Sequence, residues 1–222
     1  MTETKSVAVV VPAYNEAATI EAVVSDLHRY ADEIIVVDDG SDDRTAEIAR
    51  TNGATVITRE ENRGYDRSLS EGVSYAAEIG ADIIVTFDAD GQHAAADIER
   101  VADPIRTGAA SIVVGRRPEP ARAAEQLFAA YTKFRFDVDD PLSGFKAYDV
   151  SVYNDIGHFD EYASIGTHLM IAAAKRGYTI AQVSINISER DDEPRFGHLR
   201  ANWSMLKALS RIVLFDIRTE LS

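Results

Sequence analysis

Short apolar runs alternate with amphipathic stretches along the first half of this sequence. The apolar runs occupy residues 7–11, 34–37, 55–58, 83–87 and 111–115. Their length and their content of Val and Ile are typical of β-strands, so the pattern predicts five strands. The run at residues 83–87 consists of β-branched and aromatic residues, which is typical of a strand buried on both faces.

Helical periodicity fills the intervals between these runs. One stripe with the spacing i, i+3, i+4 and i+7 consists of Ile20, Val23, Val24 and Leu27. We expect Asn15 to cap this helix and Ser41 to cap the next one, with further helices over residues 66–79 and 97–105. Alternating strands and helices predict an α/β fold, in which helices flank a mostly parallel sheet joined by right-handed crossovers.

Polar loops follow the first four predicted strands, at residues 12–16, 38–41, 62–64 and 88–93. In open α/β sheets, ligands bind at the carboxyl ends of the strands. A single loop rich in Asp, Asn and Gly is explained by turn formation alone. Four such loops at one edge of the sheet favour a ligand-binding site there.

The loop at residues 88–92 reads Asp-Ala-Asp-Gly-Gln and directly follows the fourth apolar run. If the chain stays extended, Asp88, Asp90 and Gln92 point to the same side, because alternate residues of a strand share a face. Three oxygen ligands suit Mg²⁺ or Mn²⁺, with water and a substrate phosphate completing the coordination shell. The alternative is a solvated turn with Gly91 at the bend.

Several common motifs are missing from the sequence. No G-x-G-x-x-G follows the first strand, and there is no P-loop, no G-x-S-x-G and no H-E-x-x-H. These absences argue against the usual dinucleotide grip, a P-loop nucleotide triphosphatase, an α/β-hydrolase and a zincin protease. Phosphate binding at this edge would therefore depend on a metal, assisted by arginines.

Three motifs in order resemble the family 2 glycosyltransferases of the GT-A fold. They are V-V-P-A-Y-N-E at 10–16, V-D-D-G-S-D-D at 37–43 and D-A-D-G-Q-H at 88–93. The last motif, together with S-G-F-K at 143–146, is most similar to the dolichyl-phosphate mannosyltransferase and glucosyltransferase branch. The resemblance covers the chain from about residue 7 to about residue 197.

The resemblance implies one Rossmann-like GT-A domain over residues 1–222. Its nucleotide-sugar-binding half covers about 1–115, its acceptor half about 116–200, and a C-terminal amphipathic helix 201–222. The implied activity is inverting, metal-dependent transfer of a sugar from a GDP- or UDP-sugar, with a polyprenyl or dolichyl phosphate as the expected acceptor. A soluble or saccharide hydroxyl acceptor is the alternative.

The resemblance also implies roles for individual residues. Nucleotide-sugar binding is implied for Pro12, Tyr14, Glu16, Asp39, Asp88, Arg190 and Arg195. Metal binding is implied for Asp88, Asp90 and Gln92, and acceptor binding for Arg116, Arg117, Ser143 and Gly144. Asp39 would read the edge of the base, and Arg190 or Arg195 would close over the diphosphate, which the arginine fork pairs well. Without the family, Arg190 and Arg195 are explained as part of a charged surface turn, and Arg116 and Arg117 as solvated side chains.

The need for a catalytic base depends on the acceptor. A lipid phosphate is already ionised near neutral pH, whereas a sugar hydroxyl requires a carboxylate within hydrogen-bond reach. Asp139 or Asp140 is our candidate for that base, and an Asp-Pro turn is the competing explanation. His168 stands where the branch often carries Glu; it is either a donor or base active near neutral pH or a structural side chain.

The acceptor segment departs from the family pattern. Between Arg117 and Asp139 the chain is short and carries the acidic residues Glu119, Glu125 and Asp137, where relatives use a longer and more basic stretch. The acceptor is therefore the least constrained part of the assignment.

Composition limits the partners and the location. The formal net charge of −14 argues against nucleic-acid binding. A polar N-terminus predicts no signal peptide, and no apolar run approaches the ~18 residues of a membrane span. The resemblance implies a cytoplasmic protein, since sugar nucleotides are made in the cytoplasm. Cysteine is absent, and the lysines are only Lys5, Lys133, Lys146, Lys175 and Lys207. An acidic, lysine-poor chain favours the hypothesis of a halophilic source, because salt screens its self-repulsion.

The C-terminal stretch has an apolar stripe formed by Trp203, Leu206, Leu209, Ile212, Val213 and Phe215. Such a stripe is compatible with peripheral membrane contact near a polyprenyl acceptor. Packing on the sheet or on a second subunit, as in a homodimer, is the alternative.

Two other classes of protein compete with the transferase. A sugar-nucleotide pyrophosphorylase should carry a Gly-rich, basic first loop, which residues 12–16 lack. A non-catalytic nucleotide-sugar-binding partner subunit would not need the candidate metal ligands.

Overall fold

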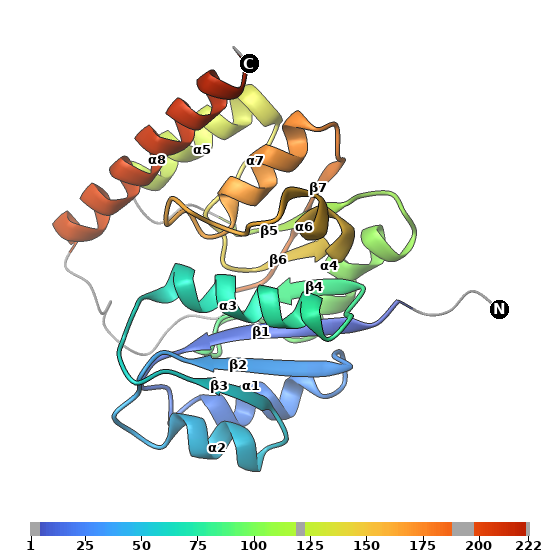
Figure 1. Cartoon of the computed structure of the whole chain (residues 1–222), viewed down its shortest axis with the longest axis vertical. Helices are drawn as coiled ribbons and strands as arrows, with labels where there is room; N and C mark the ends of the chain where they lie inside the picture. The colour runs from blue at the N-terminus through green and yellow to red at the C-terminus, as the bar shows by residue number, and fades with distance from the viewer. Residues whose placement is uncertain (1–4, 119–122, 188–197, 221–222) are drawn as a thin grey trace.

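A seven-stranded sheet with the strand order β3-β2-β1-β4-β6-β5-β7 forms the middle layer of the molecule (Figure 1). The computed structural model describes residues 5–118, 123–187 and 198–220. The strands are β1 Val7–Ala13, β2 Glu33–Asp38, β3 Thr55–Thr58, β4 Ile83–Thr86, β5 Ile112–Arg116, β6 Lys146–Asp149 and β7 Ile180–Ser184. The strands β3, β2, β1 and β4 are parallel neighbours, as the alternating pattern predicts.

Helices cover both faces of the sheet. They are α1 Ile20–Leu27, α2 Thr45–Thr51, α3 Tyr65–Glu78, α4 Asp97–Arg106, α5 Ala123–Phe136, α6 Val150–Ile156, α7 Thr167–Lys175 and α8 His198–Glu220. The alternate residues Val7, Val9 and Val11 of β1 pack in one core with α1, α2 and α4. Ala8 and Val10 face a second core that contains side chains of α3, α5, α6, α7 and α8. The predicted α/β fold with helices on both faces is confirmed.

The second half of the sheet contains strands that the sequence pattern did not predict. The strand β5 does not lie next to β4, because the antiparallel strand β6 is inserted between them. The sequence pattern missed β6 and β7. Their sequences, Lys-Ala-Tyr-Asp and Ile-Ala-Gln-Val-Ser, contain no unbroken apolar run, so the signal that located the first strands is absent from them.

Both predicted helix caps are wrong. Asn15 has a positive φ of 54°, and α1 begins only after Thr19. The Asn15 side chain instead accepts a hydrogen bond from the backbone N–H of Asp42, and the backbone N–H of Asn15 donates to Ser41 Oγ. Ser41 in turn donates to Asp38, and α2 begins at Thr45. These polar residues therefore join the loops after β1 and β2 rather than starting helices.

A buried ionic contact holds α8 against α5 and α7. Asp216, only 1% exposed, accepts hydrogen bonds from Tyr131 of α5 at 2.6 Å and Arg135 at 2.9 Å, and from Lys175 of α7 at 2.8 Å. Burial alone would raise the pKa of Asp216, but the bonds from Arg135, Lys175 and Tyr131 lower it to about 2. Among the described residues, no helix combines the length and the apolar character that crossing a membrane requires.

This contact predicts a specific loss of stability in acid. The pKa of Asp216 falls from 3.8 to about 2 on folding, so the carboxylate contributes about 2 kcal/mol above pH 4. That contribution disappears as the pH falls from about 4 to about 2. Urea unfolding should show Asp216→Asn destabilised at neutral pH and converging on the wild type in acid. Asp155→Asn, which breaks a half-exposed pair with Arg176, should be much less destabilising, because solvent screens an exposed ion pair; equal losses would contradict the prediction.

Candidate active site

Asp88 and Asp90 line one pocket of about 370 Å³ beyond the carboxyl end of β4. We call it the β4 pocket. Its other lining residues come from loops and helices far apart in the sequence and are Tyr65, Arg117, Glu125, Leu142, Gly144, Ile165 and Met205. The two carboxylates that the sequence singled out are thus brought together at the expected edge of the sheet.

The extended conformation that the sequence predicted for residues 88–92 is wrong, however. The chain leaves the sheet after Thr86 and forms a turn over residues 89–90, so strand alternation does not orient Asp88, Asp90 and Gln92. Gly91, with φ of 74°, makes the bend, and the N–H of Gln92 donates to Asp90 Oδ1 at 3.1 Å. Gln92 is not among the residues that line the β4 pocket.

Asp88 is held from two sides. The Tyr65 hydroxyl donates to Oδ1 at 2.5 Å, and His93 Nε2 lies 3.0 Å from Oδ2. The His93 ring packs against Phe87 and Phe145, with centroid distances of 5.7 and 5.2 Å. Burial would raise the pKa of Asp88, but the hydrogen bonds from His93 and Tyr65 and the charge of Arg117 lower it below its ordinary value. Asp88 is therefore ionised at neutral pH.

These two carboxylates fit a hard divalent cation. Carboxylate oxygens are the ligands that Mg²⁺ and Mn²⁺ prefer, and partners that orient a ligand carboxylate are typical of metal sites. Sequence reasoning assigned no role to Tyr65. It included His93 in the motif at residues 88–93 but assigned no role to this residue either. Tyr65 directly follows the predicted loop at 62–64, which is the one signal that pointed toward it.

Gly144 leaves room for Asp88. A methyl group at this position would lie 2.7 Å from Asp88 Oδ2 and 2.7 Å from the Tyr65 hydroxyl. Gly144→Ala is therefore expected to displace the carboxylate and to lower kcat/KM about 10²-fold, the cost of a misplacement of about 1 Å. Nucleotide-sugar turnover measures the effect.

Gly108→Ala is the matched control for this prediction. Gly108 has φ of 73° with open space around it, so the added methyl group should cost about 1 kcal/mol of stability through backbone strain and leave turnover unchanged. Full activity of Gly144→Ala would contradict the prediction.

The predicted base-reading residue Asp39 lies just beyond β2 and is 3% exposed. Its carboxylate accepts hydrogen bonds from Arg59 at 3.0 Å and from the N–H groups of Arg63 and Gly64 at 2.9 and 2.7 Å. These bonds fix the loop after β3 against the loop after β2. Sequence reasoning missed Arg59, which belongs to no motif.

The loop after β1 carries the other predicted nucleotide-binding residues. Pro12 is buried at the end of β1, Tyr14 is 37% exposed, and Glu16 accepts a hydrogen bond from Thr19 at 3.0 Å. Arg190 and Arg195 lie outside the described residues.

The predicted acceptor residue Arg117 is paired with two buried carboxylates. Its guanidinium donates to Asp140 through two bonds of 2.8 Å and to Glu125 at 3.0 Å. Burial would lower the pKa of Arg117, but Asp140 and Glu125 raise it. Arg117 is thus a fixed positive charge in the wall of the β4 pocket.

Arg116 faces a different hollow. This β5 hollow, of about 420 Å³, is lined by Arg116, Arg117, Pro118, Asp139, Asp140, Ser184, Ile185 and Asn186. Arg116 lies 3.2 Å from Asp139, which also pairs with Lys133 at 3.1 Å. Hydrogen bonding to Lys133 is the largest cause of the lowered pKa of Asp139. Arg116, Arg117 and both candidate bases thus share one hollow.

The Ser143 segment is supported by a buried lysine. Lys146 Nζ donates to the carbonyl oxygens of Ser143 and Ile165, each at 2.6 Å. Burial lowers the pKa of Lys146 to about 7. The two carbonyls belong to segments that reach the β4 pocket through Gly144 and Ile165, so Lys146 positions two of its walls.

His168 does not line the β4 pocket. It is 1% exposed, and its ring lies against Tyr162 and Phe215, with centroid distances of 4.4 and 4.6 Å.

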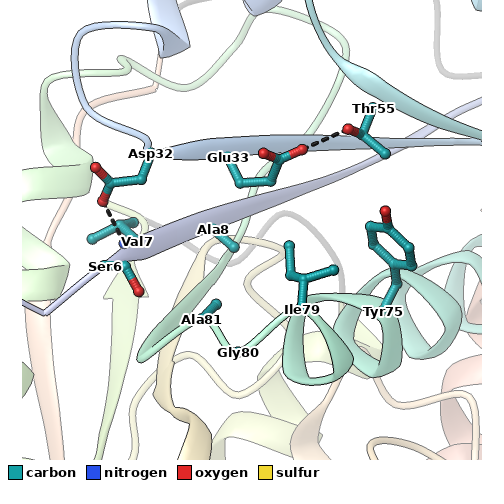
Figure 2. A pocket seen from close by; sticks show the side chains of 10 residues that line it. All are labelled: Ser6, Val7, Ala8, Asp32, Glu33, Thr55, Tyr75, Ile79, Gly80 and Ala81. Atoms are coloured by element: carbon teal, nitrogen blue, oxygen red, sulfur yellow. Dashed lines mark hydrogen bonds between the residues drawn. The ribbon is translucent and has the colours of Figure 1, made fainter.

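A further hollow of about 410 Å³ lies at the amino end of β1 and β2 (Figure 2). Its carboxylates are engaged locally: Asp32 accepts from the N–H of Val7, and Glu33 accepts from Thr55 (Figure 2). It lies at the edge opposite the one where open α/β sheets bind ligands. We therefore assign the chemistry to the β4 pocket.

This α/β fold with an acidic pair at the carboxyl end of β4 is compatible with a glycosyltransferase, and comparison with known proteins shows that class. The chain belongs to glycosyl transferase family 2, whose family model matches residues 8–159. It is 33% identical over 222 residues to a dolichyl-phosphate hexose transferase of Haloferax volcanii, covering 93% of each chain. It is 34% identical over 178 residues to a UDP-N-acetylglucosamine–dolichyl-phosphate N-acetylglucosaminyltransferase of Methanococcus voltae, covering 66% of this chain and 70% of the relative.

A solved structure with the same GT-A fold is glucosyl-3-phosphoglycerate synthase from Mycobacterium tuberculosis in complex with Mn²⁺, UDP and glucosyl-3-phosphoglycerate. Its TM-score is 0.75 at 25% identity, covering 96% of this chain and 80% of that one. The family and its dolichyl-phosphate branch agree with the resemblance that the motifs carry.

Proposed function

We propose that this protein transfers a sugar, with inversion, from a GDP- or UDP-sugar to a polyprenyl or dolichyl phosphate. The observation that carries the proposal is the placement of Asp88 and Asp90 in one pocket with Arg117. The names of the dolichyl-phosphate relatives and the Mn²⁺ and UDP bound by the solved neighbour support it.

In this proposal residues 1–115 form most of the donor site and residues 116–200 form the acceptor half, which also supplies Arg190 or Arg195 to the donor diphosphate. Asp88 and Asp90, with Gln92, would hold a divalent metal whose charge stabilises the leaving diphosphate. The loops carrying Pro12, Tyr14, Glu16 and Asp39 would surround the nucleoside. Arg190 or Arg195 would add a second positive charge.

Hydrogen bonds within the chain hold the proposed metal ligand Asp88 in place. Tyr65 and His93 hold Asp88 in one orientation. Preorganised charges of this kind lower the barrier because they need no rearrangement as negative charge develops.

For the acceptor, Arg116 in the β5 hollow is the favoured phosphate contact. Gly144 in the wall of the β4 pocket and the preceding Ser143 would contribute as well. A lipid phosphate would replace Asp139 as the partner of Arg116, since that pair is partly exposed. Arg117 already pairs with Asp140 and Glu125. It would therefore mainly position these two side chains rather than bind the acceptor phosphate directly.

A hydroxyl acceptor is the second candidate. The carboxylates of Asp139 and Asp140 in the β5 hollow favour it, because a hydroxyl needs a base. Asp139 would then be the base. Asp140 is less suited, because Arg117 donates three hydrogen bonds to its carboxylate.

The experiment that tests the proposal is a donor and acceptor screen. Calorimetric titration with UDP and GDP, with and without Mn²⁺, identifies which nucleobase of the donor the protein prefers. The preferred UDP- or GDP-sugar is then offered with polyprenyl phosphate or with saccharides, and NMR of the product gives the anomeric configuration. We expect metal-dependent nucleotide binding and a sugar-phosphate lipid of inverted configuration. Binding without metal, or a retained configuration, would refute it.

The proposal includes contact with the membrane that holds the acceptor. The helices α5 and α8 lie side by side (Figure 1) and expose Leu127, Phe134, Leu206, Leu214 and Ile217. The exposed charged side chains on the described part of α8 are the basic residues Lys207, Arg211 and Arg218, in a chain of net charge −14. Apolar and basic side chains together favour an anionic membrane surface.

Vesicle flotation provides the test of this contact. Phe134→Ser, which removes a side chain that is 87% exposed, should weaken binding to anionic vesicles about tenfold, since burying such a side chain contributes about 1.5–3 kcal/mol. Ile79→Ser removes an exposed apolar side chain from the amino-end hollow (Figure 2) and should leave binding unchanged. Equal effects, or a dimer that masks Phe134, would contradict the membrane proposal.

The proposal also places the reaction in the cytoplasm, where sugar nucleotides are made, and at high salt. Stability that does not rise between low and molar KCl would contradict the halophilic part, because screening should relieve the self-repulsion of an acidic chain.

A further inference from the structure

Three metal-binding side chains converge outside the β4 pocket. His158 lies just after α6, Glu161 lies in the loop before α7, and His168 lies in the first turn of α7. One ligand atom of each lies within 4.8 Å of the others. The three family motifs do not include these residues. His168 stands at a position where the branch often carries Glu, but it does not line the β4 pocket, and the proposed reaction does not use it.

The distance between the two histidines fits a tetrahedral metal site. His158 Nε2 and His168 Nε2 lie 3.3 Å apart. Two zinc–nitrogen bonds of about 2.0–2.1 Å at a tetrahedral angle separate their nitrogens by about 3.3 Å. Glu161 is exposed, so its side chain can rotate toward the histidines without disturbing the core.

The surroundings of His168 favour its neutral form. His168 is packed against Tyr162 and Phe215. Its burial, followed by the charge of His158, lowers its pKa to about 4. At neutral pH the imidazole is therefore in the uncharged form that binds metals.

A hydrogen bond between the imidazoles is the competing explanation of their approach. The N–H of Glu161 lies 3.4 Å from His168 Nδ1, which favours a proton on Nε2 that donates to His158. At 3.3 Å the bond between the two imidazoles is long and therefore weak. A cation can take its place when the hydrogen moves from Nε2 to Nδ1 of His168, which breaks the long contact of Nδ1 with the N–H of Glu161.

We propose that His158, Glu161 and His168 form a second metal site, which binds Zn²⁺ rather than Mg²⁺. Two imidazoles with one carboxylate select borderline transition metals, whereas Mg²⁺ and Mn²⁺ prefer oxygen ligands. The site closes the loop over residues 158–168. Within that loop the N–H of Ile165 donates to Asp66, and its carbonyl accepts from Lys146. Zinc would thereby stiffen the wall that Ile165 contributes to the β4 pocket.

Calorimetric titration of the EDTA-treated full-length chain with ZnCl₂ tests this site. The expected result is binding that excess Mg²⁺ does not displace, a rise in Tm on zinc addition, and visible absorption when Co²⁺ is used in place of zinc. Asp90→Asn should leave this binding intact, which separates the site from the β4 pocket and from the proposed transferase function.

Variants of the ligands complete the test. His158→Ala should weaken zinc binding at least about 10–100-fold, the loss measured even for residues that only support a metal ligand, and Glu161→Gln should weaken it less. His28→Ala removes an imidazole that contacts the Asn52 carbonyl and should have no effect. Retained metal-dependent UDP binding would show that His158→Ala is folded. Absence of zinc binding, unchanged affinity in His158→Ala, or loss in Asp90→Asn would overturn the proposal.

Discussion

Replacing Asp90 with asparagine is expected to lower sugar transfer about 10³-fold or more while leaving the fold intact. Asparagine keeps the shape of the side chain and the oxygen that accepts from the N–H of Gln92. It removes the negative charge that a hard cation requires. A metal contributes several kcal/mol to transition-state stabilisation, and each 1.4 kcal/mol corresponds to a factor of ten in rate.

Three measurements check this prediction. The variant should lose metal-dependent nucleotide binding in calorimetry, its turnover should fall to that of the wild type in EDTA, and its Tm should change little. Asp103→Asn, which alters an exposed carboxylate on α4, should retain full binding and turnover. If Asp90→Asn kept the wild-type rate, the β4 pocket would not be the metal-dependent site.

The first half of the fold was predictable because its signal is local. The strands β1 to β4 carry apolar runs, and the helices between them repeat their apolar side chains every three to four residues. The strand β6 lacks this signal. Its Lys146 is buried and bonded to the carbonyls of Ser143 and Ile165, so a lysine occupies a place where the pattern would require an apolar residue.

The candidate site was predictable where residues sit in one motif and unpredictable where distant segments meet. Asp88 and Asp90 were found because they follow a buried strand. Tyr65 reaches Asp88 across 23 positions of the sequence and Arg59 reaches Asp39 across 20. No spacing rule in a single sequence encodes such contacts, since they depend on the order of strands in the sheet.

Arg117→Ala is expected to cause the largest loss of stability, about 3–5 kcal/mol. The change leaves Asp140 and Glu125 without their cation, and both side chains are only 7% exposed. Removing one partner of a buried ion pair costs this much because the remaining charge stays desolvated. Urea unfolding at neutral pH, with activity followed on the same samples, measures the effect.

The neighbouring arginine supplies the control. Arg116 pairs with Asp139 across a half-exposed contact, with side-chain exposures of 48% and 31%, so Arg116→Ala should cost less than about 1 kcal/mol. Combining Arg117→Met with Asp140→Asn and Glu125→Gln should recover most of the lost stability, because no buried charge is then left unpaired. Equal losses in Arg116→Ala and Arg117→Ala, or no recovery in the triple variant, would mean that Arg117 stabilises the protein by some means other than charge pairing. In that case its role as a fixed positive charge beside Asp88 would have to be abandoned.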